Sequence, residues 1–187
     1  MLTLSRVAPL VIALALAGCA GGHYRPVSDM PVKLGVPYRV RGTTYVPAVD
    51  PTYNTLGYAS WYGTESGSRT ASGERFRSDW VTGAHKTLPL PTYVEVTALA
   101  TGRRIILRIN DRGPFAGGSA RIIDLSRGAA EQLGLRKMGP VAVRVRRIDP
   151  SADDRARLRK GKSAHPLPPI SENDRLTLRS QLDASGF

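Results

Sequence analysis

The chain has 187 residues, with 27 lysines and arginines, 15 acidic residues, a net charge of +12 and one cysteine. This length accommodates one domain with tails or two very small domains, and 41% hydrophobic residues exclude a wholly disordered chain. One cysteine excludes an internal disulfide framework and a multi-cysteine zinc site. Nineteen glycines and 14 prolines favour short strands and turns over a helical bundle. The positive charge indicates an anionic partner: nucleic acid, anionic lipid or an acidic polymer.

The N-terminal residues predict an export signal that ends at a lipid attachment site. Residues 7–17 are apolar, which is too short for a membrane span of about 20 residues but typical of a signal peptide. Leu16-Ala17-Gly18-Cys19 resembles a bacterial lipobox, with small residues that fit a peptidase cleft and a thiol that accepts diacylglycerol. The alternative is an ordinary secretory signal followed by a chance cysteine. We expect residues 1–18 to be removed and Cys19 to hold the chain on a membrane.

The residue after the cysteine predicts the location of the lipidated chain. It is Ala20 and not aspartate, which in lipoproteins of Gram-negative bacteria implies passage to the outer membrane. We therefore expect the chain on the periplasmic face of the outer membrane, with the plasma membrane as the alternative. Residues 19–31 are expected to form a flexible, lipidated tether.

The remaining chain predicts a small all-β domain. Residues 32–56 are expected to be an N-terminal extension that packs on this domain, as a hairpin or a segment clamped on a sheet edge. Thr101-Gly102 predicts a hairpin turn, and Ser126 is expected to cap a short helix ended by Gly134. The domain, residues 57–149, has predicted strands at 58–62, 93–99, 104–109, 122–125 and 141–148, and a helix at 127–133. Strands of this length with one short helix indicate a closed β-barrel.

After the domain the composition changes. Residues 150–187 are charged and then rich in proline, which predicts a flexible tail with one or two helical turns over 176–182. The predicted domain carries 15 basic and 8 acidic residues, so most of the positive charge belongs to the folded body.

Three clusters carry candidate site residues. Glu74 follows a glycine turn, His85 lies in a segment bounded by prolines, and Asp111 lies where an apolar strand breaks into a turn. Acidic and histidine side chains at strand ends beside rigid turns can build a site at the rim of a barrel. Each also has a structural interpretation: Asp111 as an Asx-turn residue, His85 as a hydrogen-bonded core histidine and Glu74 as a solvated turn residue. Asp124, in a predicted strand before the helix, is interpreted as structural.

Five motifs in a fixed order resemble the rare lipoprotein A family of septal-ring lytic transglycosylases. They are Gly57-Tyr-Ala-Ser-Trp-Tyr-Gly63, Thr70-Ala-Ser-Gly-Glu74, Ala84-His-Lys-Thr-Leu-Pro-Leu-Pro91, Asn110-Asp-Arg-Gly-Pro-Phe115 and Ile123-Asp-Leu-Ser126. The resemblance implies a six-stranded double-psi β-barrel with one short helix and flexible tails, related to expansins. It implies that Asp111 is the catalytic acid and His85 its partner. The residues that we expect to contact substrate are Glu74, Lys86, Arg112, Trp61 and Tyr62.

The expected reaction is cleavage of the MurNAc–GlcNAc β-1,4 bond of peptidoglycan. The C6 hydroxyl of muramic acid attacks its own anomeric carbon and leaves a 1,6-anhydro end, so one carboxyl group can serve as acid and then as base. A mechanism with one carboxyl group agrees with the single strong acid candidate in the sequence, Asp111. We expect its carboxyl group to start protonated because apolar neighbours disfavour its charged form. The alternative is a non-catalytic, expansin-like barrel that binds or loosens the wall.

Other partners and groups are not expected. Nucleic-acid binding predicts basic residues interleaved with aromatic ones, whereas this chain has few aromatic residues and an export signal. No cofactor is expected, and no metal site, because His23, His85 and His165 share no ligand spacing. Residues 150–187 are too few and too charged for the glycan-binding SPOR module of many relatives.

Overall fold

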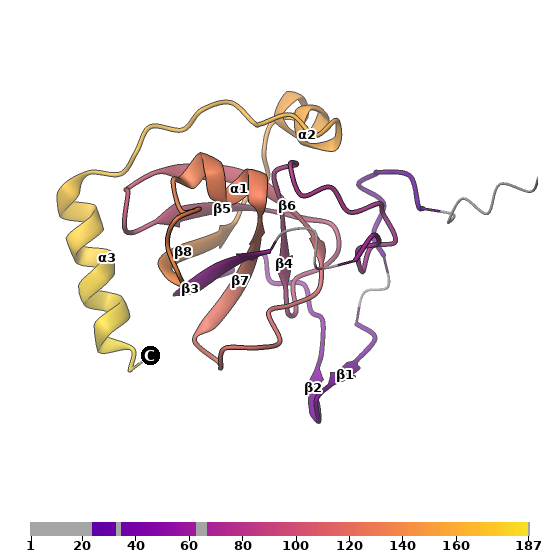
Figure 1. Ribbon diagram of the computed structural model, residues 1–187, viewed down its shortest axis with the longest axis horizontal. Helices are drawn as coiled ribbons and strands as arrows, with labels where there is room; N and C mark the ends of the chain where they lie inside the picture. The colour runs from indigo at the N-terminus through magenta and orange to yellow at the C-terminus, as the bar shows by residue number, and fades with distance from the viewer. Residues whose placement is uncertain (1–23, 33–34, 63–66, 187) are drawn as a thin grey trace, which may run out of the picture.

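The computed structural model describes residues 24–32, 35–62 and 67–186, so the predicted signal peptide and Cys19 lie outside the described residues. Six strands close into a barrel, which confirms the expected fold class (Figure 1). The barrel strands are β3 (Asn54–Tyr62), β4 (Thr82–His85), β5 (Thr92–Ala98), β6 (Arg104–Asp111), β7 (Arg121–Ser126) and β8 (Val141–Arg147). They are arranged in the order β3-β7-β4-β6-β5-β8. The β3–β7 and β4–β6 pairs are parallel, and the other four are antiparallel.

Strand β4 was not predicted from the sequence. All four of its residues are buried, so the alternation that marks a half-exposed strand is absent, and glycine and alanine have low β-propensity. At Gly83 a Cβ atom would lie 3.0 Å from the carbonyl oxygen of Asp124 on the neighbouring strand. The small residues therefore allow β4 to fit between β6 and β7.

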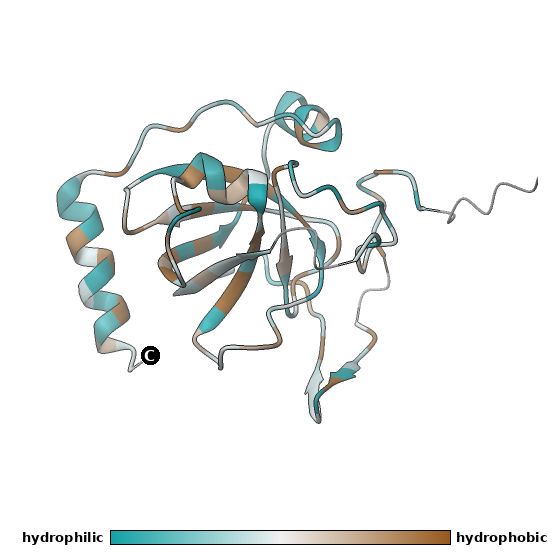
Figure 2. Cartoon of the chain, viewed as in Figure 1, coloured by the Kyte–Doolittle hydropathy of each residue, from teal (hydrophilic) through white to brown (hydrophobic). Residues whose placement is uncertain are grey.

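The barrel interior is filled by alternate residues of its strands. Ile105, Leu107 and Ile109 of β6 face the core, and Val141, Val143 and Val145 of β8 do the same. The alternation is visible as brown and teal bands in Figure 2. Burying each such side chain contributes about 1.5–3 kcal/mol, so the β-barrel is the main source of stability.

The short helix is the one that the sequence predicts. Helix α1 (Arg127–Leu133) begins after Ser126, whose hydroxyl oxygen accepts a hydrogen bond from the Ala129 amide, and ends at Gly134 with a φ of 76°. Its face of Ala129, Ala130 and Leu133 is fully buried and joins the barrel core.

The N-terminal extension forms the expected hairpin, but the tether beside it is docked. Strands β1 (Tyr38–Val40) and β2 (Thr43–Tyr45) are antiparallel and joined by a two-residue turn with positive φ at both positions. Within residues 24–32, the Ser28 carbonyl accepts a hydrogen bond from Arg108 at 2.5 Å, and Asp29 accepts one from the Tyr93 hydroxyl at 2.7 Å. The described part of the predicted tether thus lies against the barrel wall.

The C-terminal residues also differ from the flexible tail predicted from composition. They form helices α2 (Ala152–Arg159) and α3 (Glu172–Ala184), each capped by a serine. Leu158, Leu178 and Leu182 are buried against the barrel. The C-terminal residues contain few apolar side chains, but these are spaced so that they contact the barrel. Average composition does not record that spacing, so it predicted a flexible tail. No described helix is long and apolar enough to cross a membrane.

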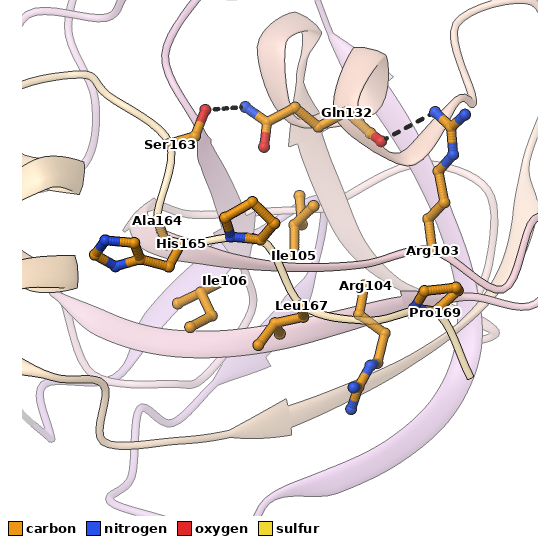
Figure 3. Close-up of a pocket in the computed structure, with 11 residues that line it drawn as sticks. Arg103, Arg104, Ile105, Ile106, Gln132, Ser163, Ala164, His165, Leu167 and Pro169 are labelled. Atoms are coloured by element: carbon orange, nitrogen blue, oxygen red, sulfur yellow. Dashed lines mark hydrogen bonds between the residues drawn. The ribbon is translucent and has the colours of Figure 1, made fainter. Parts of the chain in front are cut away.

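The segment between α2 and α3 crosses the outside of the barrel and covers a hollow of about 440 Å³ (Figure 3). Gln132 donates a hydrogen bond to Ser163 at 2.7 Å, and Arg104 donates one to the Pro168 carbonyl at 2.8 Å. Ile106, on the outer face of β6, and Ile105 at the start of that strand are among its lining residues. The hollow lies between this segment and the barrel, and its lining contains no acidic residue.

Candidate active site

The strand register brings two carboxylates to one row across the barrel wall. Ser60 of β3 pairs with Asp124 of β7, Asp124 pairs with Ala84 of β4, and Ala84 pairs with Asp111 of β6. Neighbours in register project to the same face of a sheet. The small Ala84 therefore separates the two aspartates and leaves room between them.

A β-bulge turns Asp111 toward this row. Gly83 pairs with Ile109 but Ala84 pairs with Asp111, so Asn110 is an extra residue in β6. Ile109 faces the core, whereas Asn110 and Asp111 both point away from it. Without the bulge, alternation would turn Asp111 inward.

Asp111 lines a hollow of about 340 Å³, here called the carboxylate hollow. Its Oδ1 atom accepts hydrogen bonds from the Ala71 and Arg112 amides, each at 2.8 Å. Burial raises the pKa of Asp111 above its usual value, the two amides and Arg112 oppose the rise, and the Asp124 charge adds to it. The residues that line the hollow are Tyr62, Arg69, Ala84, Asp111, Arg112, Gly113, Phe115 and Asp124.

Asp124, the second carboxylate, is in a different environment. Its Oδ1 atom accepts a hydrogen bond from the Ser60 hydroxyl at 2.5 Å, and its Oδ2 atom is ion-paired with Arg121 at 3.1 Å. The carboxylate is thus held by a hydroxyl and a cation, whereas Asp111 is held mainly by backbone amides. Two carboxyl groups in unlike environments can divide acid and charge-stabilising roles.

Tyr62 supplies a phenol to the same hollow. Its hydroxyl is buried and has no hydrogen-bond partner within the described ranges. Burial raises the pKa of Tyr62, and the charges of Asp111 and Asp124 raise it further. The phenol therefore stays protonated and is a hydrogen-bond donor beside both carboxylates.

The structure does not bring the His85 ring into the carboxylate hollow. His85 follows Ala84 on β4, so its side chain lies on the other face of the strand, 4% exposed and edge-on to Tyr53. Its Nδ1 atom accepts hydrogen bonds from the Thr87 and Leu88 amides at 3.2 and 2.9 Å, and Nε2 lies 2.9 Å from the Tyr53 hydroxyl. Burial, with Arg112 and Lys86, lowers the pKa of His85 to about 3. The imidazole is neutral and orders the turn after β4.

This turn holds Arg112, which does line the hollow. The Arg112 guanidinium donates to the carbonyls of His85 and Leu88 at 3.3 and 2.6 Å. His85 and Asp111 are therefore connected through the backbone and Arg112, and not by a contact between their side chains.

Glu74 lies in a buried ion pair and not in the hollow. Its two carboxylate oxygens accept hydrogen bonds from Arg108 at 2.7 and 2.8 Å, and Asn110 donates to one of them at 3.0 Å. Glu74 is 3% exposed. The interpretation of Glu74 as a solvated turn residue is therefore wrong, because the carboxylate is buried and paired with the Arg108 guanidinium.

Lys86 and Trp61 lie near the hollow but not in its lining. The Lys86 ammonium donates to the Arg121 carbonyl at 2.8 Å, and its pKa is lowered by burial and Arg121, with Asp124 opposing. Trp61 packs against the barrel core, with Arg136 6.0 Å from the centre of its ring. Of the seven site residues predicted in the barrel, Asp111, Arg112 and Tyr62 line the hollow.

Sequence reasoning placed Asp124 among structural residues and did not single out Ala84. Both belong to the site only through pairing between strands far apart in the chain. Among the described residues no cluster of three metal-ligating side chains occurs.

The barrel belongs to the double-psi class: a family model described as lytic transglycolase matches residues 54–145, from the start of β3 into β8. The chain is a member of the rare lipoprotein A family.

Three curated relatives carry the name "Endolytic peptidoglycan transglycosylase RlpA". One from Pseudomonas aeruginosa is 52% identical over 61% of this chain and 33% of its own length. One from Rickettsia felis is 43% identical over 66% of this chain and 52% of its own. One from Neisseria meningitidis is 41% identical over 73% of this chain and 51% of its own. The chain thus spans about a third to a half of these relatives.

Proposed function

We propose that this protein is a lytic transglycosylase that cleaves the MurNAc–GlcNAc β-1,4 bond of peptidoglycan, with Asp111 as the acid. The observation that carries the proposal is a carboxyl group of raised pKa in a hollow that it shares with a second, ion-paired carboxylate. The names of the curated relatives support the same reaction.

In the first step, protonated Asp111 donates its proton to the glycosidic oxygen, and the bond from that oxygen to the anomeric carbon of MurNAc breaks. The positive charge that develops at the anomeric carbon is stabilised by the Asp124 carboxylate across Ala84. In the second step the MurNAc C6 hydroxyl attacks this carbon and gives its proton to the Asp111 carboxylate. The product carries a 1,6-anhydro end, no water is consumed, and Asp111 is protonated again.

Neighbouring residues position the sugar and the acid. Tyr62 donates a hydrogen bond from the wall of the hollow, and Arg112 lies at its edge. His85 acts as a positioning residue: its ring orders the turn whose carbonyls hold Arg112. Substrate contacts through Glu74, Lys86 or Trp61 are not required by this mechanism.

The test is incubation of the full-length chain, purified in detergent, with purified sacculi, followed by mass analysis of soluble products. We expect 1,6-anhydro-muropeptides from the unchanged chain and a loss of about 10²–10⁴-fold for Asp111→Asn. Asp79→Asn is the matched control, because Asp79 is an exposed aspartate of the same domain. Binding to sacculi without any 1,6-anhydro product would instead support the non-catalytic, wall-loosening alternative.

We further propose that Cys19 carries the lipid anchor, that the chain lies on the periplasmic face of the outer membrane, and that it acts in wall remodelling and cell separation. The support is the lipobox Leu16-Ala17-Gly18-Cys19 and the alanine after it. Growth with an alkyne-labelled fatty acid should label the unchanged chain and not Cys19→Ser. Recovery of the labelled chain in the plasma-membrane fraction would contradict the outer-membrane assignment.

A further inference from the structure

Three aromatic rings form a cluster between the β1–β2 hairpin and the carboxylate hollow. Tyr38 and Tyr45 are a cross-strand pair whose rings stack with centroids 5.3 Å apart. Phe115, which lines the carboxylate hollow, lies 6.1 Å from the Tyr38 ring and 5.6 Å from the Tyr45 ring. The aromatic cluster therefore continues the wall of the hollow onto the hairpin, which projects beyond the barrel in Figure 1.

The hairpin is fastened to the turn that also holds Arg112. The Tyr38 hydroxyl donates to the Lys86 carbonyl at 2.5 Å, and the Ala48 amide donates to the Thr87 carbonyl at 3.0 Å. The Arg112 guanidinium lies 5.7 Å from the centre of the Tyr38 ring. These contacts fix the hairpin relative to Asp111, so its rings are in place before a ligand binds.

A second hollow of about 270 Å³, here called the hairpin hollow, lies on the other side of Arg112. Pro37, Tyr38 and Pro47 of the N-terminal extension line it, together with Ala71, Leu90 and Arg112 of the barrel domain. Arg112 lines both hollows, and the Ala71 amide donates to Asp111. The two hollows therefore adjoin along one surface.

The chemistry of this surface suits a sugar ring. One face of a pyranose presents polarised C–H bonds, which pack on the negative face of an aromatic ring, and its hydroxyls accept hydrogen bonds from a guanidinium. The three rings of the cluster are partly exposed, and Arg112 supplies the cation beside them. A glycan strand bound at Asp111 extends beyond the carboxylate hollow in both directions along the strand. The hairpin hollow lies next to the carboxylate hollow and can therefore hold sugar units on one side.

We infer that the β1–β2 hairpin is a substrate-binding arm, in which the aromatic cluster and the hairpin hollow hold a sugar unit of the glycan strand next to those held at Asp111. The inference rests on the proposed function for its ligand. The hairpin residues Tyr38 and Tyr45 lie before the family match, which begins at residue 54, whereas Phe115 and Arg112 lie within it. The arm makes long glycans better ligands than short ones.

The test uses the full-length Asp111→Asn chain, which binds without cutting, and MurNAc–GlcNAc tetrasaccharide and octasaccharide in titration calorimetry. Adding Tyr45→Ala should lower the ratio of octasaccharide to tetrasaccharide affinity by about tenfold, as expected for one lost aromatic contact. Adding Tyr45→Phe, which keeps the ring, should preserve the ratio. Thr44→Ala is the control, because Thr44 is exposed and lies on the opposite face of β2.

The inference is overturned if Tyr45→Ala leaves the ratio unchanged, if Thr44→Ala lowers it equally, or if neither oligosaccharide binds. It is also overturned if Tyr45→Ala weakens binding to phosphatidylglycerol vesicles and not to the octasaccharide, since the hairpin would then contact a membrane. Failure of the proposed reaction is seen separately, as the absence of 1,6-anhydro products from the unchanged chain while the binding ratio persists.

Discussion

Replacing Asp111 by asparagine tests the acid chemistry of the carboxyl group without removing the hydrogen bonds that hold the side chain in the fold. Asparagine keeps an Oδ1 acceptor for the Ala71 and Arg112 amides, which bind Asp111 at 2.8 Å each. Those two hydrogen bonds, about 1 kcal/mol each, are therefore retained. What is lost is the transferable proton and the negative charge.

The sign of the stability change follows from the raised pKa of Asp111, whose first cause is burial. The folded chain binds this proton more tightly than the unfolded chain, so at neutral pH the half-buried anion destabilises the fold. The asparagine variant avoids that cost, so we expect it to have a higher Tm than the unchanged chain at pH 7. The gain should shrink as pH falls through the folded-state pKa and vanish below the ordinary aspartate pKa of about 3.9.

The assay is thermal unfolding of the unchanged chain and of Asp111→Asn between pH 3 and pH 8, with sacculus digestion in parallel. Asp79→Asn, at an exposed position, controls for loss of any one negative charge. A variant that unfolds at a lower temperature at every pH, or that still releases product at the original rate, would refute the assignment of Asp111 as a half-buried acid of raised pKa.

The other predictions concern the surroundings of Asp111 and the C-terminal helices. Activity should fall as pH rises through the pKa of Asp111, because the acid must begin protonated; a rate that climbs steadily with pH contradicts this. Ala84→Leu should fill the carboxylate hollow and lower sacculus digestion at least about 100-fold at a stability cost of about 1–3 kcal/mol, whereas Ala152→Leu, on the surface of α2, should not. His85→Ala should lower Tm, because the Thr87 and Leu88 amides lose their acceptor at about 1–3 kcal/mol each, yet keep the shape of the pH–activity profile. Leu182→Ala should cost about 2–5 kcal/mol of stability in chemical denaturation, and Leu176→Ala, at a position 54% exposed on the same helix, should cost much less.

The sequence predicts the strands and the helix that are specified by neighbouring residues in the chain. Alternation marks β5, β6 and β8, and a serine and a glycine bracket α1. Asp111 could be found because it ends an apolar strand beside a glycine–proline turn. The lipid attachment at Cys19 stays a prediction, since it lies outside the described residues.

The rest depends on pairing across the chain. Asp124 shares a site with Asp111 because β4 lies between β6 and β7, and no local pattern encodes that order. Glu74 meets Arg108 from 34 residues away, so its burial could not be read from a turn motif. The two segments that flank the barrel, residues 24–32 and 150–186, contact it through a few side chains such as Asp29 and Leu182. Amino-acid composition gives no information on where individual side chains lie, so it could not predict these contacts.

The row from Ser60 through Asp124 and Ala84 to Asp111 also has a dynamic consequence. It crosses four neighbouring strands of a closed barrel, so no local fluctuation can separate its members while the ladders between them persist. Backbone amides of this row that are paired between strands should therefore exchange slowly with solvent, which hydrogen-exchange measurements would check. Moving the two carboxylates apart would therefore require breaking the strand pairing that closes the barrel.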